Sequence, residues 1–267
     1  MTGPAPAKIN LALVVGPVRP DGKHELVTVY QRVDVTDRIT VGPAPETTVT
    51  GFPGDTLVRD ALEALAAPHG WLARVEKRIP VAAGLGGGSS DAATALRLAN
   101  AQLAQPRSAA ELHELAAGLG ADVPFFLHDG PRLGTGDGTA LAPLELPQDF
   151  WVLLLLPDGA VKPSTAEVYA AFDARDGAAG FEARAAAVRD ALASVARPRD
   201  LARLPANDLA SSPLAGRLVE HGAFRADVSG AGPALYGLFT RRADAARAAR
   251  ALRGLGRTWI AAPAWYG

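Results

Sequence analysis

The stretch Gly84-Leu85-Gly86-Gly87-Gly88-Ser89-Ser90-Asp91 decides the fold. It follows a predicted strand at 72–79 and leads into a strongly helical segment at 92–103. Glycines permit positive φ and let a ligand approach the backbone without a Cβ clash, and a helix N-terminus offers unpaired N–H groups to an anion. The order strand, glycine-rich turn, helix therefore favours a phosphate-binding loop over a mobile Gly-Ser connection that ends in a serine cap.

Two common phosphate-binding motifs do not fit this chain. A Walker A loop needs four residues between its first Gly and the Gly-Lys-Ser/Thr group, whereas five residues separate Gly16 from Gly22, and His24 follows Lys23. A dinucleotide-binding unit needs a second strand after its first helix, whereas 92–119 is predicted to be helical. In the loop at 84–91, Ser89 and Ser90 can cap the following helix or donate their hydroxyls to phosphate or to a magnesium shell.

The composition of the 267 residues excludes several kinds of chemistry. Because the chain has no cysteine, disulfides, thiolate nucleophiles and cysteine-ligated metals are ruled out. Charges nearly cancel, with 27 Lys and Arg against 28 Asp and Glu, so binding to nucleic acid or to an acidic membrane is not favoured. No apolar run approaches the roughly 20 residues of a membrane span, and the N-terminus lacks a signal-peptide pattern. We therefore predict a soluble cytoplasmic protein.

Strand-like and helix-like segments mix in a way that predicts an α+β fold in two parts. Strands are predicted at 9–15, 26–35, 39–41, 72–79, 150–156, 224–228, 235–239 and 258–261, and helices at 55–67, 92–103, 109–119, 164–172, 181–195, 213–221 and 243–252. Gly120 is expected to end its helix in the left-handed conformation. The stretch 130–147 is predicted to consist of turns, and we place a domain boundary there, between 1–147 and 148–267.

Further motifs, taken in order, resemble those of one kinase superfamily. They are Pro6-Ala7-Lys8-Ile9-Asn10-Leu11, Asp21-Gly22-Lys23-His24-Glu25-Leu26, the loop at 84–91, Gly120-Ala121-Asp122-Val123-Pro124-Phe125, Ser164-Thr165-Ala166-Glu167-Val168-Tyr169, Asn207-Asp208-Leu209 and Ser229-Gly230-Ala231-Gly232-Pro233. Their order is that of the GHMP kinases, which include galactokinase, homoserine kinase and mevalonate kinase, and the resemblance spans nearly the whole chain. It implies a ribosomal-protein-like, ATP-binding N-terminal lobe and a ferredoxin-like, substrate-binding C-terminal lobe, with the active site in the cleft between them.

Within this superfamily, the chain is most similar to the branch that phosphorylates the 2-hydroxyl of a cytidine-diphosphate-linked methylerythritol in non-mevalonate isoprenoid synthesis. The resemblance implies ATP as co-substrate and Mg²⁺ bound mainly through the nucleotide, with no metal site built from protein side chains alone and with either serine of the loop able to contact the ion. It also implies a small-molecule substrate, with no nucleic-acid or membrane partner. Another small alcohol, such as homoserine or mevalonate, is an alternative substrate.

The resemblance also assigns roles to individual residues. The catalytic pair is Lys8, whose charge would stabilise the reacting groups, and Asp122, the base for the substrate hydroxyl. Taken alone, Asp122 fits a turn or helix cap and Lys8 fits an exposed strand edge, and the resemblance reverses both readings. The residues implied for the nucleotide are Pro80, Ala83, Gly84, Leu85, Gly86, Gly87, Gly88, Ser89 and Ser90, and those implied for the substrate are Asn10, His24, Thr165 and Tyr169.

Two positions depart from the family pattern. Lys23 stands where the family usually has a Tyr that stacks on cytosine, and a Lys is not an aromatic platform. Thr56 stands where the family usually has Asn before Leu-Val. Two other functions are less compatible with the sequence. The presence of both Lys8 and Asp122 disfavours a nucleotide-binding regulator without catalysis, and the lack of basic clustering disfavours a nucleic-acid binder.

Overall fold

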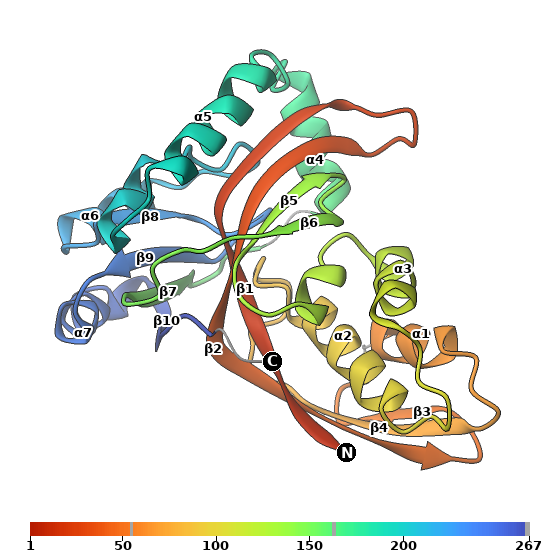
Figure 1. Cartoon of the computed structure of the whole chain (residues 1–267). Coiled ribbons are helices and arrows are strands. Elements are labelled where there is room, and N and C mark those ends of the chain that lie inside the picture. Colours follow the sequence, from red (N-terminus) through yellow and green to blue (C-terminus); the bar gives the residue numbers. More distant parts are fainter. Residues whose placement is uncertain (54–55, 162–163, 265–267) are drawn as a thin grey trace.

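One long β-hairpin runs through the centre of the molecule; it belongs to the N-terminal sheet and packs against the C-terminal one (Figure 1). The computed structural model describes residues 1–53, 56–161 and 164–264. Strand β1 (Thr2–Val18) pairs antiparallel with strand β2 (His24–Ala44), and both are almost entirely buried over their central parts. Because β-branched and apolar residues dominate these segments, the hairpin can lie between the two halves of the protein and pack on both sides.

The N-terminal sheet has six strands, in the order β3-β4-β2-β5-β6 with β1 on β2. The remaining elements of this lobe are β3 (Thr48–Thr50), β4 (Gly70–Glu76), β5 (Arg132–Gly136), β6 (Ala140–Pro143), helices α1 (Thr56–Ala64), α2 (Gly87–Asn100) and α3 (Ala109–Leu119), and the 3₁₀ helix η1 (Pro124–Leu127). An apolar cluster joins the sheet to these helices, with Ile39 and Val41 packed near Leu62 and Leu96. The helices therefore cover one face of the sheet.

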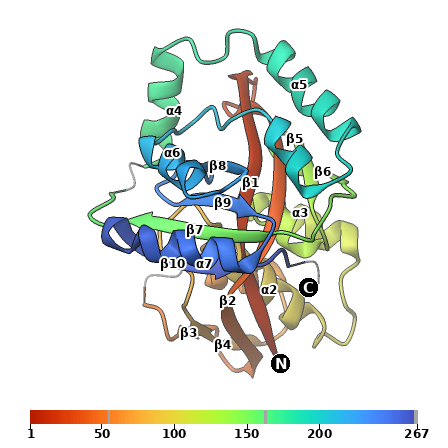
Figure 2. The same cartoon turned by 90° about the vertical axis from the view of Figure 1, so that its left-hand side faces the viewer.

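The C-terminal sheet has four antiparallel strands in the order β10-β7-β9-β8. They are β7 (Trp151–Pro157), β8 (Arg225–Val228), β9 (Leu235–Phe239) and β10 (Gly256–Ala261); the helices of this lobe are α4 (Thr165–Ala174), α5 (Phe181–Ala193), η2 (Pro198–Arg203), α6 (Pro213–Glu220), α7 (Arg242–Ala251) and η3 (Arg253–Leu255). Helices α6 and α7 cover one face of this sheet, while α4 and α5 lie beside the tip of the hairpin (Figure 2). No helix among the described residues is long and apolar enough to cross a membrane.

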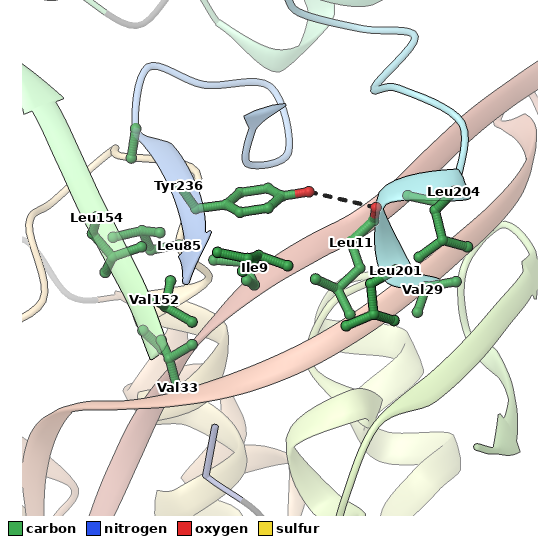
Figure 3. Close-up of a cluster of buried hydrophobic side chains, with 14 of the residues drawn as sticks. Ile9, Leu11, Val29, Val33, Leu85, Val152, Leu154, Leu201, Leu204 and Tyr236 are labelled. Carbon is green, nitrogen blue, oxygen red and sulfur yellow. Dashed lines mark hydrogen bonds between the residues drawn. The ribbon is translucent and has the colours of Figure 1, made fainter. Parts of the chain in front are cut away.

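The largest apolar cluster lies where the two lobes meet (Figure 3). Ile9 of β1, Val152 of β7 and Tyr236 of β9 belong to it, and the Tyr236 hydroxyl donates to the Leu11 carbonyl at 3.4 Å. Leu85, from the middle of the glycine-rich loop, is 1% exposed and packs into the same cluster. Burying this leucine anchors an otherwise flexible loop to the core of the protein.

Most predicted elements are confirmed, and the differences have local causes. The stretch 130–147 contains the hairpin β5–β6, which short turn-rich segments did not indicate, and β3 was also not predicted. Helix α2 begins at Gly87 rather than at residue 92, because helix propensity alone places glycines outside a helix. The prediction for Gly120 is wrong: its φ of 164° and ψ of 153° are extended, not left-handed.

Candidate active site

A cavity of about 550 Å³ lies between the glycine-rich loop, strand β1 and helix α4. Several predicted site residues line it: Lys8, Asn10, Pro80, Ala83, Gly84, Leu85, Gly86, Gly87, Gly88, Ser89, Asp122, Thr165 and Tyr169. The turn at 230–231 closes part of the wall. Segments that are far apart in the chain therefore meet around one space, as the resemblance implied.

The two glycine-rich turns pack backbone against backbone. Gly84 has a φ of +83°, and a Cβ at this position would lie 2.3 Å from the Ser229 carbonyl oxygen. The Ser229 hydroxyl donates to the Gly84 carbonyl at 3.0 Å, and the Ala234 N–H donates to the Ala83 carbonyl at 2.9 Å. Only glycine fits this conformation and this close approach, so the loop is held in one shape before any ligand arrives.

The same loop also touches Lys8. Gly86 is the N-cap of α2, with a φ of 69°, and a Cβ there would lie 2.9 Å from Lys8 Cγ. The Lys8 N–H donates to the Leu85 carbonyl at 2.9 Å. The N-terminus of α2, with its free N–H groups and partial positive charge, therefore opens into the cavity beside an ammonium group.

The structure separates the two neighbouring serines. Ser89 lines the cavity, whereas Ser90 is fully buried and its side chain does not. The Ser90 N–H is also used, because it donates to the Gly86 carbonyl at 2.9 Å. Ser90 is therefore not placed to bind a ligand in the cavity, a distinction that required the helical direction of α2.

Lys8 and Asp122 form an ion pair on the cavity wall. Lys8 Nζ lies 3.3 Å from Asp122 Oδ2; the lysine side chain is 4% exposed and the aspartate side chain 33%. Lys8 Nζ also donates to Asn10 Oδ1 at 2.7 Å, since residues two apart on a strand share a face. Asn10 Nδ2 donates to Thr28 Oγ1 at 2.8 Å, which leaves the amide oxygen directed at the ammonium.

Tyr30 is a member of this site that sequence reasoning missed. It lies opposite Asn10 in the β1–β2 register, and its hydroxyl donates to Asp122 Oδ1 at 3.1 Å. Burial raises the pKa of the Tyr30 phenol well above its usual value, and the nearby Asp122 charge raises it further. The phenol therefore remains a hydrogen-bond donor to the carboxylate at neutral pH. Only the register could have identified it, because the residue reads as an ordinary strand aromatic.

Buried Arg32 holds the segment that follows Asp122. Its Nη2 donates to the Phe126 carbonyl at 2.9 Å and also to the His128 carbonyl. Burial lowers the pKa of Arg32 to about 10, which still leaves the guanidinium charged at neutral pH. A cation bound to the end of η1 thus fixes the turn from which the Asp122 side chain projects.

A second cation, Lys77, also lines the cavity and was not predicted. Its Nζ lies 2.6 Å from Asp37 Oδ2 and 2.6 Å from Asp91 Oδ2. Burial would lower the pKa of Lys77, but the two carboxylates outweigh it and raise the pKa. A Cβ on Gly87 would lie 3.3 Å from this ammonium, so Lys77 stands directly against the loop.

Two aromatic rings lie at the α4 side of the cavity. Tyr169 lines the cavity, whereas His24 lies behind it, with ring centroids 4.6 Å apart and an interplanar angle of 31°. His24 Nε2 is 2.9 Å from Asp173 Oδ1. The structure thus places His24 against Tyr169 rather than on the cavity surface. Thr165 does line it, and the N-cap of α4 is Ser164, whose hydroxyl accepts from the Glu167 N–H at 3.2 Å.

The two positions that depart from the family pattern lie in different situations. Lys23 Nζ contacts Asp137 Oδ2 at 2.5 Å, with the lysine side chain 54% exposed. Burial would raise the pKa of Asp137, but hydrogen bonds from Lys23 and Thr139 lower it to about 2. The Lys23 side chain is therefore directed at Asp137 rather than at the Tyr169 ring. The side chain of Thr56 lies outside the described part of the chain.

A cation, a carboxylate and an anion-binding helix N-terminus in one cavity are suited to phosphoryl transfer, which depends on positioning and charge stabilisation. The family model of the GHMP kinases N terminal domain matches residues 56–130, and that of the GHMP kinases C terminal domain matches residues 210–258. The fold, the cavity and these matches define a GHMP kinase, an enzyme class of ATP-dependent phosphotransferases.

Proteins of similar sequence identify the family within this class. A 4-diphosphocytidyl-2-C-methyl-D-erythritol kinase of Anaeromyxobacter dehalogenans is 39% identical, over 94% of this chain and 84% of that protein. A Salinispora tropica protein of the same name is also 39% identical, over 94% and 87%. The chain belongs to the 4-diphosphocytidyl-2-C-methyl-D-erythritol kinase family.

Solved structures agree with this assignment. A crystal structure of 4-(cytidine 5'-diphospho)-2C-methyl-D-erythritol kinase covers 100% of both chains with a TM-score of 0.77 and 35% identity. A mevalonate kinase structure has a TM-score of 0.74 at 13% identity, over 98% of this chain and 99% of that one. The latter likeness shows that the fold is shared across the superfamily.

Proposed function

We propose that this protein transfers the γ-phosphoryl group of ATP to the 2-hydroxyl of 4-diphosphocytidyl-2-C-methyl-D-erythritol. The observation that carries the proposal is the Lys8–Asp122 ion pair, at 3.3 Å, beside a rigid glycine-rich loop in one cavity. The names of the relatives that cover most of the chain support this acceptor.

The loop end of the cavity is assigned to the triphosphate. Gly84–Ser89 and the N-terminus of α2 supply backbone N–H groups, and Lys8 and Lys77 supply positive charge close to them. We assign Mg²⁺ to the nucleotide phosphates, where it would neutralise charge on the transferred group. The Ser89 hydroxyl is the loop side chain suited to its coordination shell, whereas Ser90 is buried.

Asp122 is assigned as the base. Its carboxylate takes the proton of the acceptor hydroxyl as that oxygen forms a bond to the γ-phosphorus, while the bond from the γ-phosphorus to the bridging oxygen breaks and ADP leaves. Lys8 stabilises the charge on the reacting oxygens. Tyr30 and Asn10 orient the carboxylate and the ammonium through hydrogen bonds of 3.1 and 2.7 Å, respectively.

The α4 end is assigned to the acceptor. Because His24 covers one face of Tyr169, the cytosine ring is expected against the part of Tyr169 that faces the cavity. Thr165 is assigned to the diphosphate, and Asn10 lies near the reacting hydroxyl. This arrangement supports the proposed division into a nucleotide-binding domain at 1–147 and a substrate-binding domain at 148–267, although Lys8 and Asp122 of the first domain serve both substrates.

The test is turnover by the full chain with ATP and Mg²⁺. ADP release is followed with the cytidyl substrate, with homoserine and with mevalonate, and the products are identified by mass spectrometry. Phosphorylation of the cytidyl substrate alone is expected. Turnover of another alcohol without turnover of the cytidyl substrate would refute the proposed acceptor.

A further inference from the structure

The segment Asn207-Asp208-Leu209 takes no part in the chemistry above, yet it contacts several walls of the cavity. We propose that Asn207 and Asp208 are positioning residues for the phosphoryl transfer. In this proposal Asn207 fixes the turn behind Lys8, and Asp208 fixes strand β1 and helix α4, which line the acceptor end of the cavity. The inference rests on the proposed function. It assigns the placement of Lys8 to Asn207 and the placement of the acceptor end to Asp208.

Asn207 is tied to the second glycine-rich turn by every polar atom of its side chain. Its Nδ2 donates to the Gly230 carbonyl at 2.7 Å and to the Val228 carbonyl at 3.0 Å, and its Oδ1 accepts from the Leu209 N–H at 2.8 Å. The residue is 8% exposed. Buried amides with all their partners in place define one geometry, because any displacement leaves a polar group unpaired.

Gly230 transmits this constraint to the catalytic lysine. It has a φ of +57°, and a Cβ at this position would lie 3.3 Å from Lys8 Nζ and 3.6 Å from Asn10 Oδ1. The Gly230 turn therefore borders the space that the Lys8 ammonium occupies, with no room for a side chain between them. A shift of the turn would change the space available to Lys8 and so its distance from Asp122.

Asp208 makes a different set of contacts. Its carboxylate accepts from the Val15 N–H at 2.9 Å and from Arg184 Nε of α5 at 3.1 Å. Its N–H donates to the Leu13 carbonyl at 2.9 Å, and its carbonyl accepts from Arg175 at the end of α4. Leu13 lines the cavity, and α4 carries Thr165 and Tyr169. Asp208 thus joins β1 and the end of α4, which both contribute to the acceptor end, to helix α5 behind them.

Each residue has a matched control elsewhere in the chain. Asn100, which is 7% exposed, donates to the Arg107 carbonyl at 3.1 Å and accepts from the Arg107 N–H at 2.7 Å. Asp200 accepts from the Arg197 N–H at 2.8 Å and pairs with Arg203 Nη2 at 3.1 Å. These controls lose the same kinds of bonds without contact to the cavity lining.

Steady-state kinetics of the full chain separate the two roles. Asn207→Asp should lower kcat at least about tenfold relative to Asn100→Asp, since small misplacements of reacting groups have large effects. Asp208→Asn should raise KM for the cytidyl substrate several-fold relative to Asp200→Asn, with kcat within about twofold. If Asn207→Asp does not fold, Asn207→Ser, which retains one donor, replaces it. Kinetics indistinguishable from the matched controls in both variants would overturn the inference.

A second readout does not depend on turnover. Lys8 is 3% exposed, so its modification by an amine-reactive acylating reagent reports whether the turn still covers it. We expect faster labelling of Lys8 in Asn207→Asp than in Asn100→Asp, measured by peptide mass spectrometry. Equal labelling rates would refute the role of Asn207 even if the wild-type chain turned over another alcohol. Absence of cytidyl turnover with faster labelling would refute the proposed function and leave the positioning role intact.

Discussion

The loop end and the α4 end of the same cavity are built on different principles. At the loop end, Lys8 and Asn10 are each 3% exposed, and the glycine-rich turns fit backbone against backbone. Around the α4 end, Lys23 and Asp173 have side chains 54% and 48% exposed, and the contacts are ion pairs and the tilted rings of His24 and Tyr169. The loop end is thus held by close packing, whereas the α4 end is bordered by exposed side chains, among them Lys23, which stands where the family usually has Tyr.

From this comparison of the two ends, we expect the largest loss of activity for a substitution of Asp122. Asp122→Asn keeps the shape of the side chain but removes the base, so kcat should fall by about 10²- to 10⁴-fold. Asp244→Asn is the control, since this carboxylate of α7 pairs with Arg247 Nη2 at 2.6 Å and is 32% exposed, against 33% for Asp122, but does not line the cavity. ADP release with the cytidyl substrate is the measurement. A near-wild-type rate in Asp122→Asn would remove the base assignment.

Gly84 tests the close packing of the loop directly. Because φ is +83° and a Cβ would meet the Ser229 carbonyl at 2.3 Å, Gly84→Ala should displace the loop. We expect kcat/KM for ATP to fall by about 10²-fold and the free energy of unfolding to fall by about 1–3 kcal/mol.

The matched control for this prediction is Gly118→Ala. Gly118 lies in α3, where a Cβ would meet no atom within 4 Å. This variant should keep its activity and gain up to about 1 kcal/mol in stability. Urea unfolding together with ATP kinetics distinguishes the two glycines, and equal behaviour of both variants would contradict the packing argument.

Tyr30→Phe should have an intermediate effect. It removes a hydrogen bond to a charged group, and if the lower part of the usual range, about 1.5 kcal/mol, is lost from the transition state, kcat should fall about tenfold. Since burial and Asp122 raise the pKa of Tyr30, the phenol stays protonated and the factor should be the same at pH 7 and at about pH 9. A factor that disappears at the higher pH would show that Tyr30 ionises there.

The smallest effect is expected at the exposed ion pair between Lys23 and Asp137. The pKa of Asp137 is lowered from about 3.8 to about 2, so its contribution to stability is present above pH 4 and is lost as the pH falls through 2. Because Lys23 is largely exposed, solvent screens the pair. Asp137→Asn should therefore lose no more than about 1 kcal/mol at pH 7, and less at pH 3. Urea unfolding at both pH values provides the test; an equal loss at both would exclude this ion pair.

Much of the fold could be predicted because its signals are local. Helix α3, strand β9 and most of β7 follow from short-range periodicity, and the glycine-rich loop follows from its own residues. The hairpin β5–β6 could not be predicted, because its strands contain Gly134 and Gly136 and are short and only partly buried. A short strand that contains glycines carries too little side-chain pattern to distinguish it from turns.

The candidate site likewise contains residues that the sequence could predict and residues that it could not. The motifs located Lys8, Asn10 and Asp122, and the cavity brings them together. The sequence could not identify Tyr30, whose role depends on the register of β1 with β2, nor Lys77, whose partners Asp37 and Asp91 come from other elements. Which residues touch across a fold depends on strand register and helix direction, which spacing alone leaves open.

The sequence by itself determined the kind of loop, the order of the motifs and the family, because these rest on residue types that are adjacent in the chain. Only the tertiary structure decided that Ser89 rather than Ser90 faces the cavity and that His24 lies behind Tyr169. It alone also brought Ser229 against Gly84, 145 residues away. Such contacts arise when packing orients whole elements, so they depend on the assembled core rather than on any one segment.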